Sequence, residues 1–235
     1  MRLFINTGGK GTRLYPLTID IPKPMVQVAG KPLLHHLVDW AKRQGVQEIV
    51  MMNGHLAEKI VEYFKGGNEL GVSIIHSIEP YPLGSGGPIK FARQHINGRF
   101  TLISGDVLCD VNLKKMESFH ERQKAHITAL VHPSSHPHDS DILQTNEEGK
   151  VIRFISKHDD HTNAGNLSNA GLCIIEPEVL DLMHEDSFNF ENYLYPRLLE
   201  ANMNFFAYNT DELMHDVGTH ERLKEAEEYL KKRTH

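Results

Sequence analysis

Short apolar runs alternate with helix-like segments through the first half of this sequence, and this alternation constrains the fold more than any other feature. Buried strands are expected at residues 3–5, 48–52, 72–76 and 100–104. Helices are expected at residues 31–44 and 56–65, and from the end of a loop at 80–87 to residue 95. Such alternation is typical of right-handed βαβ units. It therefore predicts an α/β fold with a mostly parallel, mixed sheet flanked by helices.

The second half of the sequence is less regular, because several strand-like runs follow one another closely. They occupy residues 127–131, 142–145, 151–155 and 172–175. This crowding predicts an antiparallel addition to the sheet. Helices are expected at 112–124, 177–184, 190–201 and from 219, with a strand at 205–208. No long linker, repeat or low-complexity segment divides the sequence, so a single domain spanning 1–235 is expected.

The charge balance and cysteine usage exclude several classes of protein. The formal net charge is −6, which offers no basic surface to a nucleic acid. The only two cysteines, Cys109 and Cys173, have no CxxC spacing, so a reducing cytoplasm is expected. No apolar run approaches the length of a membrane span, and no signal-peptide pattern is present. The expectation is a cytoplasmic protein that binds neither membrane nor nucleic acid.

A glycine-rich loop, Gly8–Arg13, directly follows the first predicted strand. In open parallel sheets, ligands bind outside the carboxyl ends of the strands. Glycines allow backbone N–H groups to approach phosphate oxygens, and Arg13 can add charge-assisted contacts. The loop is not a Walker A motif, and Leu14 occupies the place of the last glycine in GxGxxG. Phosphate binding and a plain tight turn both remain open at this point.

Three further residues have the chemistry of a phosphate and metal site. Lys23 lies between two prolines, which restrict where its ammonium can reach. Asp106 follows the predicted strand 100–104, and Asp216 lies in a similar stretch of sequence. A carboxylate at the end of a strand suits Mg²⁺. A solvated lysine and ordinary turn aspartates are the alternatives. Together the two acids indicate metal-assisted phosphoryl chemistry.

The string GGKGTRLYPLTIDIPKP resembles the signature of the sugar-1-phosphate nucleotidylyltransferases, roughly GGxGTRLxPLT followed by a short gap and PKP. The resemblance continues in register through GKPLLHHLVDWAKRQGVQEIV, EPYPLGSGG, SGDVLCDV, SNAGLCIIEPEVL and HDVGTHERL, and so covers essentially the whole chain. It implies a GT-A-like, Rossmann-like fold. It also implies a reaction in which a sugar 1-phosphate attacks the α-phosphorus of a nucleoside triphosphate. Pyrophosphate leaves, and a nucleotide-sugar forms.

The resemblance assigns a role to each matching residue. The triphosphate would lie against Gly8, Gly9, Gly11 and Thr12. The expected catalytic residues are Arg13 on the pyrophosphate side, Lys23 at the α-phosphate and Asp106, which with Asp216 would bind Mg²⁺. Gly84 and Ser85 would lie near the base, and Lys157 and Asn169 would hold the sugar phosphate. Under this assignment, residues 1–110 form approximately a nucleotide-binding half and residues 111–235 a sugar-phosphate-binding half.

The sequence departs from the family pattern around Lys157. Relatives carry Glu-Lys-Pro there, whereas Ser156 and His158 flank this lysine. Asp139 and Asp141 are the candidates to replace the missing acceptor, and Asp141 is assigned to the sugar-phosphate site. These departures resemble the heptose 1-phosphate branch, with GTP as the favoured nucleotide. Mannose-type, glucose-type and N-acetylated sugars remain alternatives, and a homo-oligomer is an open alternative to a monomer.

Other functional classes fit the sequence less well. A sensor that has lost turnover would have damage at Arg13, Lys23, Asp106 or Asp216, yet all four are present. A glycosyltransferase would need an Asp-x-Asp motif, which is absent, and a dehydrogenase fails on the glycine spacing. The histidine cluster favours surface loops near a sugar site over zinc, because no recognised ligand spacing is present. This cluster comprises His132, His136, His138, His158 and His161.

Overall fold

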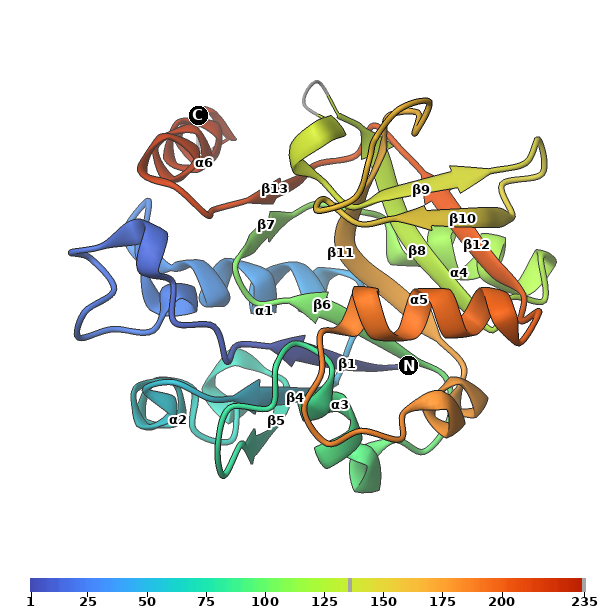
Figure 1. The fold of residues 1–235 in the computed structure, drawn as a ribbon. Coiled ribbons are helices and arrows are strands. Elements are labelled where there is room, and N and C mark those ends of the chain that lie inside the picture. The colour runs from blue at the N-terminus through green and yellow to red at the C-terminus, as the bar shows by residue number, and fades with distance from the viewer. Residues whose placement is uncertain (135–136, 234–235) are drawn as a thin grey trace. The chain divides into compact units, whose positions relative to one another are not determined.

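The computed structural model describes residues 1–134 and 137–233, and the α/β fold class predicted from the sequence is confirmed (Figure 1). The chain divides into two compact units that interleave along the sequence. The first unit comprises Arg2–Pro82, Ser104–Val111 and the segment from Glu212 onward. The second comprises Leu83–Ile103 and Asn112–Asp211, together with Met1. The predicted halves, residues 1–110 and 111–235, were continuous, and the single-domain assignment stays a prediction.

Three parallel strands form the sheet of the first unit. They are β1 (Arg2–Asn6), β4 (Glu48–Asn53) and β5 (Ser73–Ile78). In the register of β1 and β4, Leu3 pairs with Ile49, and β4 pairs with β5 in turn. The linking helices are α1 (Leu33–Arg43) and α2 (Ala57–Phe64). These elements confirm the βαβ prediction, because buried apolar residues fill both the strands and one face of α1.

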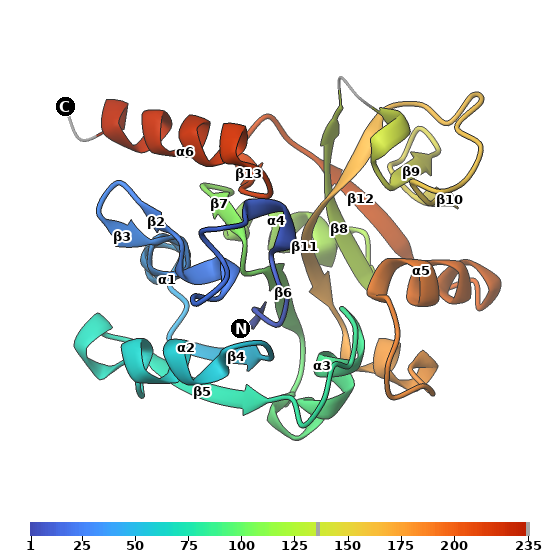
Figure 2. The same cartoon turned by 60° about the vertical axis from the view of Figure 1, so that its left-hand side comes forward.

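One short hairpin, one further antiparallel strand pair and a final helix complete the first unit, and neither strand pair was predicted from the sequence. The hairpin pairs β2 (Gln27–Val28) with β3 (Lys31–Pro32), and the other pair joins β7 (Val107–Cys109) to β13 (Met214–Asp216). Strands of two or three residues are too short to produce a readable period. Helix α6 (His220–Arg233) packs against this region, as Figure 2 shows. Ala226 is buried there with Leu223 and Leu230 against it.

The second unit contains the predicted antiparallel addition. Its strands are β6 (Phe100–Ser104), β8 (Ile127–Pro133), β9 (Ile142–Thr145), β10 (Val151–Ile155), β11 (Leu167–Ile175) and β12 (Phe205–Asn209). Strand β11 pairs antiparallel with β6, β8 and β9, whereas β12 pairs parallel with β8. Strand β11 begins earlier than expected. Its register against β8 shifts between Asn169 and Cys173, and this bulge interrupts the apolar pattern.

Helices α3 (Gly87–Phe91), α4 (Leu113–Arg122) and α5 (Phe190–Glu200) belong to this unit. The helix expected to reach residue 95 ends at Phe91 and continues as a 3₁₀ turn, Arg93–His95. The helix expected at 177–184 is a 3₁₀ helix, Pro177–Leu182. Shorter 3₁₀ turns lie at Thr12–Leu14, Lys23–Met25, Asn68–Leu70 and Pro137–Asp139. No helix in the described ranges combines the length and apolar character needed to cross a bilayer.

Candidate active site

The glycine-rich loop leaves the end of β1 and is anchored before it begins. The buried hydroxyl of Thr7 lies 2.8 Å from both the Met52 carbonyl oxygen and Asn53 Oδ1 at the end of β4. In addition, the Thr7 N–H donates to the Met52 carbonyl at 3.0 Å. Thr7 therefore links the end of β1 to the end of the parallel strand β4 through hydrogen bonds. This link fixes where the loop starts.

Two positions of the loop require glycine, because a side chain there would collide with neighbouring atoms. Gly11 has φ +64°, and a Cβ there would lie 2.7 Å from the Cβ of Lys23. A Cβ on Gly8 would lie 2.4 Å from Oε1 of Glu79, whereas Gly9 has open space around it. Within the described chain, the N–H groups of Gly9 through Thr12 donate no hydrogen bond. The loop thus presents unused backbone donors, which suits a phosphate.

The centre of the site is the ammonium of Lys23. Its side chain is only 7% exposed, and Nζ donates to Asp106 Oδ2 and lies 3.5 Å from Asp216 Oδ1. A buried ammonium is stable only when opposite charges compensate it. The structure therefore brings together three residues that the sequence analysis selected separately. Pro22 and Pro24 hold the 3₁₀ turn that carries the lysine.

Strand pairing explains how Asp216 reaches Asp106. In the antiparallel pair of β7 and β13, Asp216 pairs with Val107, the residue directly after Asp106. The Val217 N–H donates to the Asp106 carbonyl at 2.9 Å and fixes this register. Arg222 of α6 donates to Oδ2 of Asp216. A Cβ on Gly218 would lie 2.9 Å from both Asp216 carboxylate oxygens and 3.0 Å from Arg13 Nη2, so this glycine leaves room between the two side chains.

The donor set fits the predicted Mg²⁺. The Asp106 and Asp216 carboxylates converge on one cation, the Lys23 ammonium, and both are partly exposed. Mg²⁺ characteristically takes one or two carboxylates and completes its shell with phosphates and water. Among the residues that the structure describes, no three His, Cys, Asp or Glu side chains form a metal cluster. A Mg²⁺ ion at this place would draw on these two carboxylates and on its substrate.

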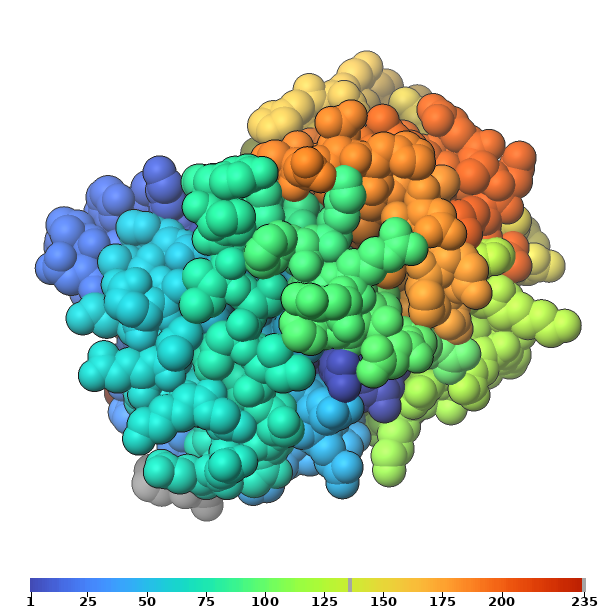
Figure 3. Space-filling view, turned by 90° about the horizontal axis from the view of Figure 1, so that it is seen from below, coloured from blue at the N-terminus to red at the C-terminus, as the bar shows by residue number. Residues whose placement is uncertain are grey.

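The predicted base-binding residues lie in the second unit, where the chain packs tightly. Gly84 has φ +74°, and a Cβ there would lie 2.3 Å from the Phe188 carbonyl oxygen. The Ser85 hydroxyl accepts a hydrogen bond from the Phe190 N–H at 2.8 Å, at the start of α5. Figure 3 shows these segments, green and orange, side by side on one face. The contacts establish a structural role for Ser85, and its role toward a base stays a prediction.

The predicted sugar-phosphate residues also lie in the second unit. Asp141 Oδ1 accepts the Lys157 N–H at 2.8 Å, and its carbonyl accepts the Asn169 N–H at 2.9 Å. Asp141 therefore connects both other residues through their backbones. A fourth member of this group, Glu191, was not predicted from the sequence, and its Oε1 lies 3.5 Å from Asn169 Nδ2. No sequence pattern signalled this proximity, because it depends on how α5 packs on β11.

The histidine prediction needs one correction. His161 is buried and does not lie on the surface. Its Nε2 lies 2.9 Å from the Ser156 carbonyl oxygen, and this hydrogen bond partly satisfies the buried ring. The His138 ring packs 5.7 Å from it, centroid to centroid. His158 is exposed as expected, His132 is half-buried, and His136 lies outside the described residues. Cys109 is buried, and burial raises the pKa of its thiol to about 12.

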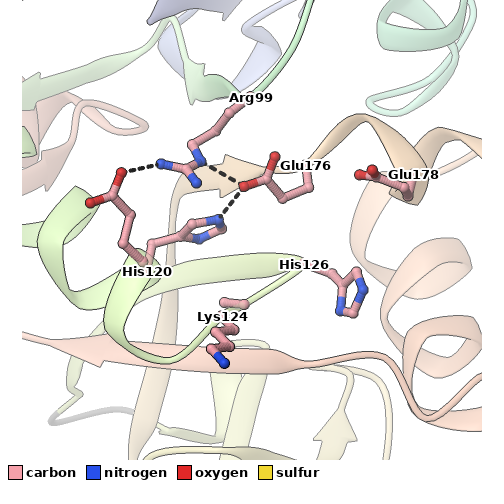
Figure 4. Close-up of a pocket in the computed structure, with 8 residues that line it drawn as sticks. Arg99, His120, Lys124, His126, Glu176 and Glu178 are labelled. Atoms are coloured by element: carbon pink, nitrogen blue, oxygen red, sulfur yellow. Dashed lines mark hydrogen bonds and ion pairs between the residues drawn. The ribbon is translucent and has the colours of Figure 1, made fainter.

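A polar pocket of about 410 Å³ lies in the second unit, and Figure 4 shows its charged lining. Arg99 donates to Glu176 at 2.6 Å and to Glu121 at 2.7 Å. The fully buried His120 lies 3.3 Å from Glu176 through Nε2 and 2.8 Å from the Thr128 hydroxyl through Nδ1. Arg99, Glu176, Glu121 and His120 thus form one network of ion pairs and hydrogen bonds. The candidate active site is the one around Lys23.

Comparison with known proteins identifies the family. A family model described as "Nucleotidyl transferase" matches residues 4–233. The chain belongs to this nucleotidyl transferase family. The resemblance found in the sequence is therefore confirmed.

Individual members of the family resemble this chain over most of its length. A mannose-1-phosphate guanyltransferase of Kluyveromyces lactis is 32% identical over 224 residues, covering 93% of this chain. A UTP–glucose-1-phosphate uridylyltransferase of Synechocystis is 30% identical over 233 residues, also covering 93%. The chain spans about 61% and 60% of the lengths of these two relatives.

Solved structures of the family share the fold. HddC from Yersinia pseudotuberculosis matches with a TM-score of 0.84 and 28% identity, covering 97% of this chain and 99% of HddC. A structure of HddC in complex with GMP-PN matches equally well. This likeness extends over both units, so the whole described chain has the architecture of a nucleotidyl transferase.

Proposed function

We propose that this chain transfers a nucleotidyl group from a nucleoside triphosphate to a sugar 1-phosphate. The observation that carries the proposal is the Lys23 ammonium, held between Asp106 and Asp216 close beside Gly11 of the open loop. A phosphate-binding loop, a buried cation and two carboxylates are the parts that phosphoryl transfer requires. Family membership supports the same reaction class.

In the proposed reaction, a phosphate oxygen of the sugar 1-phosphate attacks the α-phosphorus of the triphosphate. The bond from the α-phosphorus to the bridging oxygen breaks, and that oxygen leaves with its electron pair as pyrophosphate. The attacking group is already an anionic phosphate, so the chain needs no nucleophile of its own. Positioning and charge neutralisation would provide most of the rate enhancement.

The individual residues would divide this work. The free N–H groups of Gly9 through Thr12 would bind the phosphates, and Arg13 would face the leaving pyrophosphate. Lys23 would stabilise the charge that builds at the α-phosphate. Asp106 and Asp216 would hold Mg²⁺, which when bound neutralises part of the triphosphate charge. Asp141, Lys157 and Asn169 would hold the sugar phosphate.

For the substrates we favour GTP and a heptose 1-phosphate. The guanyltransferase relatives and the GMP-PN complex of HddC support a guanine nucleotide. Ser156 and His158, in place of Glu and Pro beside Lys157, support a sugar other than the common hexoses. Mannose 1-phosphate is the principal alternative, because mannose-1-phosphate guanyltransferases are among the similar relatives.

The test is pyrophosphate release with Mg²⁺ across the four ribonucleoside triphosphates and a panel of sugar 1-phosphates. The panel contains D-glycero-D-manno-heptose 1-phosphate, mannose 1-phosphate, glucose 1-phosphate and an N-acetylated sugar 1-phosphate. Release that requires one triphosphate together with one sugar phosphate supports the proposal and identifies both substrates. Nucleotide binding without release from any pair would instead favour a sensor.

A further inference from the structure

Glu191 occupies a defined position beside the predicted sugar-phosphate residues. It lies in the first turn of α5, whose N-cap residue Asn189 accepts the Asn192 N–H at 2.9 Å. This cap fixes where the helix starts and therefore where the Glu191 side chain emerges. From there, Oε1 lies 3.5 Å from the side-chain nitrogen of Asn169 on β11. The residue is only partly covered, so one carboxylate is available beside Asn169.

Tyr195, one helical turn after Glu191, orients the Asn169 amide. The fully buried Tyr195 hydroxyl donates to Asn169 Oδ1 at 3.4 Å, so the amide nitrogen faces Glu191. The Sγ atom of Cys173 lies 3.4 Å from the same hydroxyl oxygen. Helix α5 and strand β11 thus present an oriented amide and a carboxylate together. Both belong to the second unit of the fold, so their relation is fixed locally.

The charges around Glu191 indicate what it can bind. Burial raises the pKa of Glu191, and the nearby Asp141 carboxylate adds to this shift, whereas a hydrogen bond from the Glu191 backbone N–H and the charge of Lys157 oppose it. The two carboxylates would repel an anion but accept hydrogen bonds from neutral hydroxyl groups. The adjacent Lys157 supplies the cation for a phosphate. This combination of one cation and neighbouring acceptors matches a phosphorylated polyol.

We propose that Glu191 binds a ring hydroxyl of the sugar 1-phosphate and thereby helps to select the sugar. The inference rests on the proposed function, because it places the sugar at Asn169 and Lys157. Asp141 Oδ1 already accepts the Lys157 N–H at 2.8 Å, whereas the Glu191 carboxylate makes a longer contact of 3.5 Å with Asn169 Nδ2. Glu191 is therefore the carboxylate of this cluster that is best placed to meet the substrate.

The experiment compares wild type with Glu191→Gln, Glu191→Ala and the control Glu200→Gln. Glu200 is an exposed acid at the other end of the same helix. Losing a hydrogen bond to a charged acceptor corresponds to about a ten- to hundred-fold rise in the KM for the sugar 1-phosphate. We expect that rise in both Glu191 variants, with the KM for the triphosphate and the melting temperature unchanged. The control should behave as wild type.

Deoxy-sugar 1-phosphates separate direct contact from a structural effect. The wild type should discriminate against one deoxy position of the sugar, and Glu191→Ala should lose that discrimination. Unchanged discrimination in Glu191→Ala would overturn the inference. So would a parallel rise in both KM values with a lower melting temperature, because that result indicates a packing role.

Direct binding distinguishes failure of this inference from failure of the proposed function. Calorimetry measures binding of mannose 1-phosphate and heptose 1-phosphate to the whole chain without turnover. Binding by wild type that is weakened in Glu191→Gln, with no pyrophosphate release, would retain the inference and reject the reaction. Normal turnover and binding in Glu191→Gln would retain the reaction and reject the inference. Absence of sugar phosphate binding to wild type would reject both.

Discussion

Lys23 donates a hydrogen bond from its ammonium to Asp106, a residue 83 positions later in the chain. This contact lies within the first unit, between a 3₁₀ turn that two prolines hold and the turn that joins β6 to β7. It creates a cation already paired with acids before any substrate arrives. An incoming phosphate would therefore meet a charge that is already in position, and the site would need little reorganisation.

Replacing Lys23 with methionine should abolish most of the activity. Loss of one preorganised donor at developing charge typically reduces kcat by about 10²–10³-fold. The measurement is steady-state pyrophosphate release with the best substrate pair. Lys31→Met is the matched control, because Lys31 is an exposed lysine on the β2–β3 hairpin. Equal rates for Lys23→Met and wild type would rule out the assigned role.

Replacing Asp106 or Asp216 with asparagine should weaken the binding of magnesium. We expect the Mg²⁺ concentration for half-maximal rate to rise at least about ten-fold, because each substitution removes one anionic ligand. The assay is a Mg²⁺ titration of pyrophosphate release, with a chelator to establish the baseline. Asp181→Asn, on an exposed ion pair with Arg93, should titrate as wild type. Unaltered titration of both site variants would contradict the metal assignment.

Gly11→Ala should destabilise the fold as well as the site. A non-glycine residue at φ +64° costs about 1–3 kcal/mol, and its Cβ would also collide with Lys23. Chemical denaturation measures the free energy of unfolding. Gly9→Ala should have a much smaller effect on stability, because a Cβ added to Gly9 would meet no atom within 4 Å. Equal losses in the two variants would show that the loop relaxes around Gly11.

Stability should fall on acidification through the buried His120. Burial is the largest cause that lowers its pKa below the ordinary 6.5, and the hydrogen bond with Glu176 opposes this shift only partly. The unfolded chain therefore binds the proton more readily than the folded chain. Stability is complete above pH 6.5 and decreases as the pH falls through 6.5 toward the lower folded-state pKa.

The test for His120 is denaturation at a series of pH values between about 5 and 8, which spans the ordinary titration of histidine. His120→Gln should flatten the acidic decline, whereas the exposed His158→Gln should leave it unchanged. A decline of the same slope in His120→Gln would assign the pH dependence to other groups.

The regular elements were predictable because their residues carry a strong period. Strands β6, β9 and β10 match their predicted ranges, since each is a run of four or five residues rich in β-branched, aromatic or other apolar side chains. The pairing of β7 with β13 was not predicted, for the opposite reason. Three-residue strands have no period, and their pairing joins segments that lie far apart in sequence.

The candidate site was predictable where side-chain chemistry and motif coincide. Lys23, Asp106 and Asp216 were each selected from their local surroundings, and the structure places them together. Glu191 and Arg222 were missed, because their importance arises only from the packing of a helix. His161 was misassigned to the surface because its partner is the backbone carbonyl of Ser156. Sequence spacing carries no information on such a contact.

The interleaving of the two units has a consequence for how this protein can change over evolutionary time. The glycine loop, Asp106 and Asp216 lie in three separate stretches of chain, and residues of the other unit separate these stretches. Any continuous stretch of gene that carries the complete set of triphosphate and metal residues therefore also carries the second unit's residues between them. New sugar preferences would have to arise by substitutions among residues such as Asp141, Lys157 and Glu191, with the reaction machinery inherited intact.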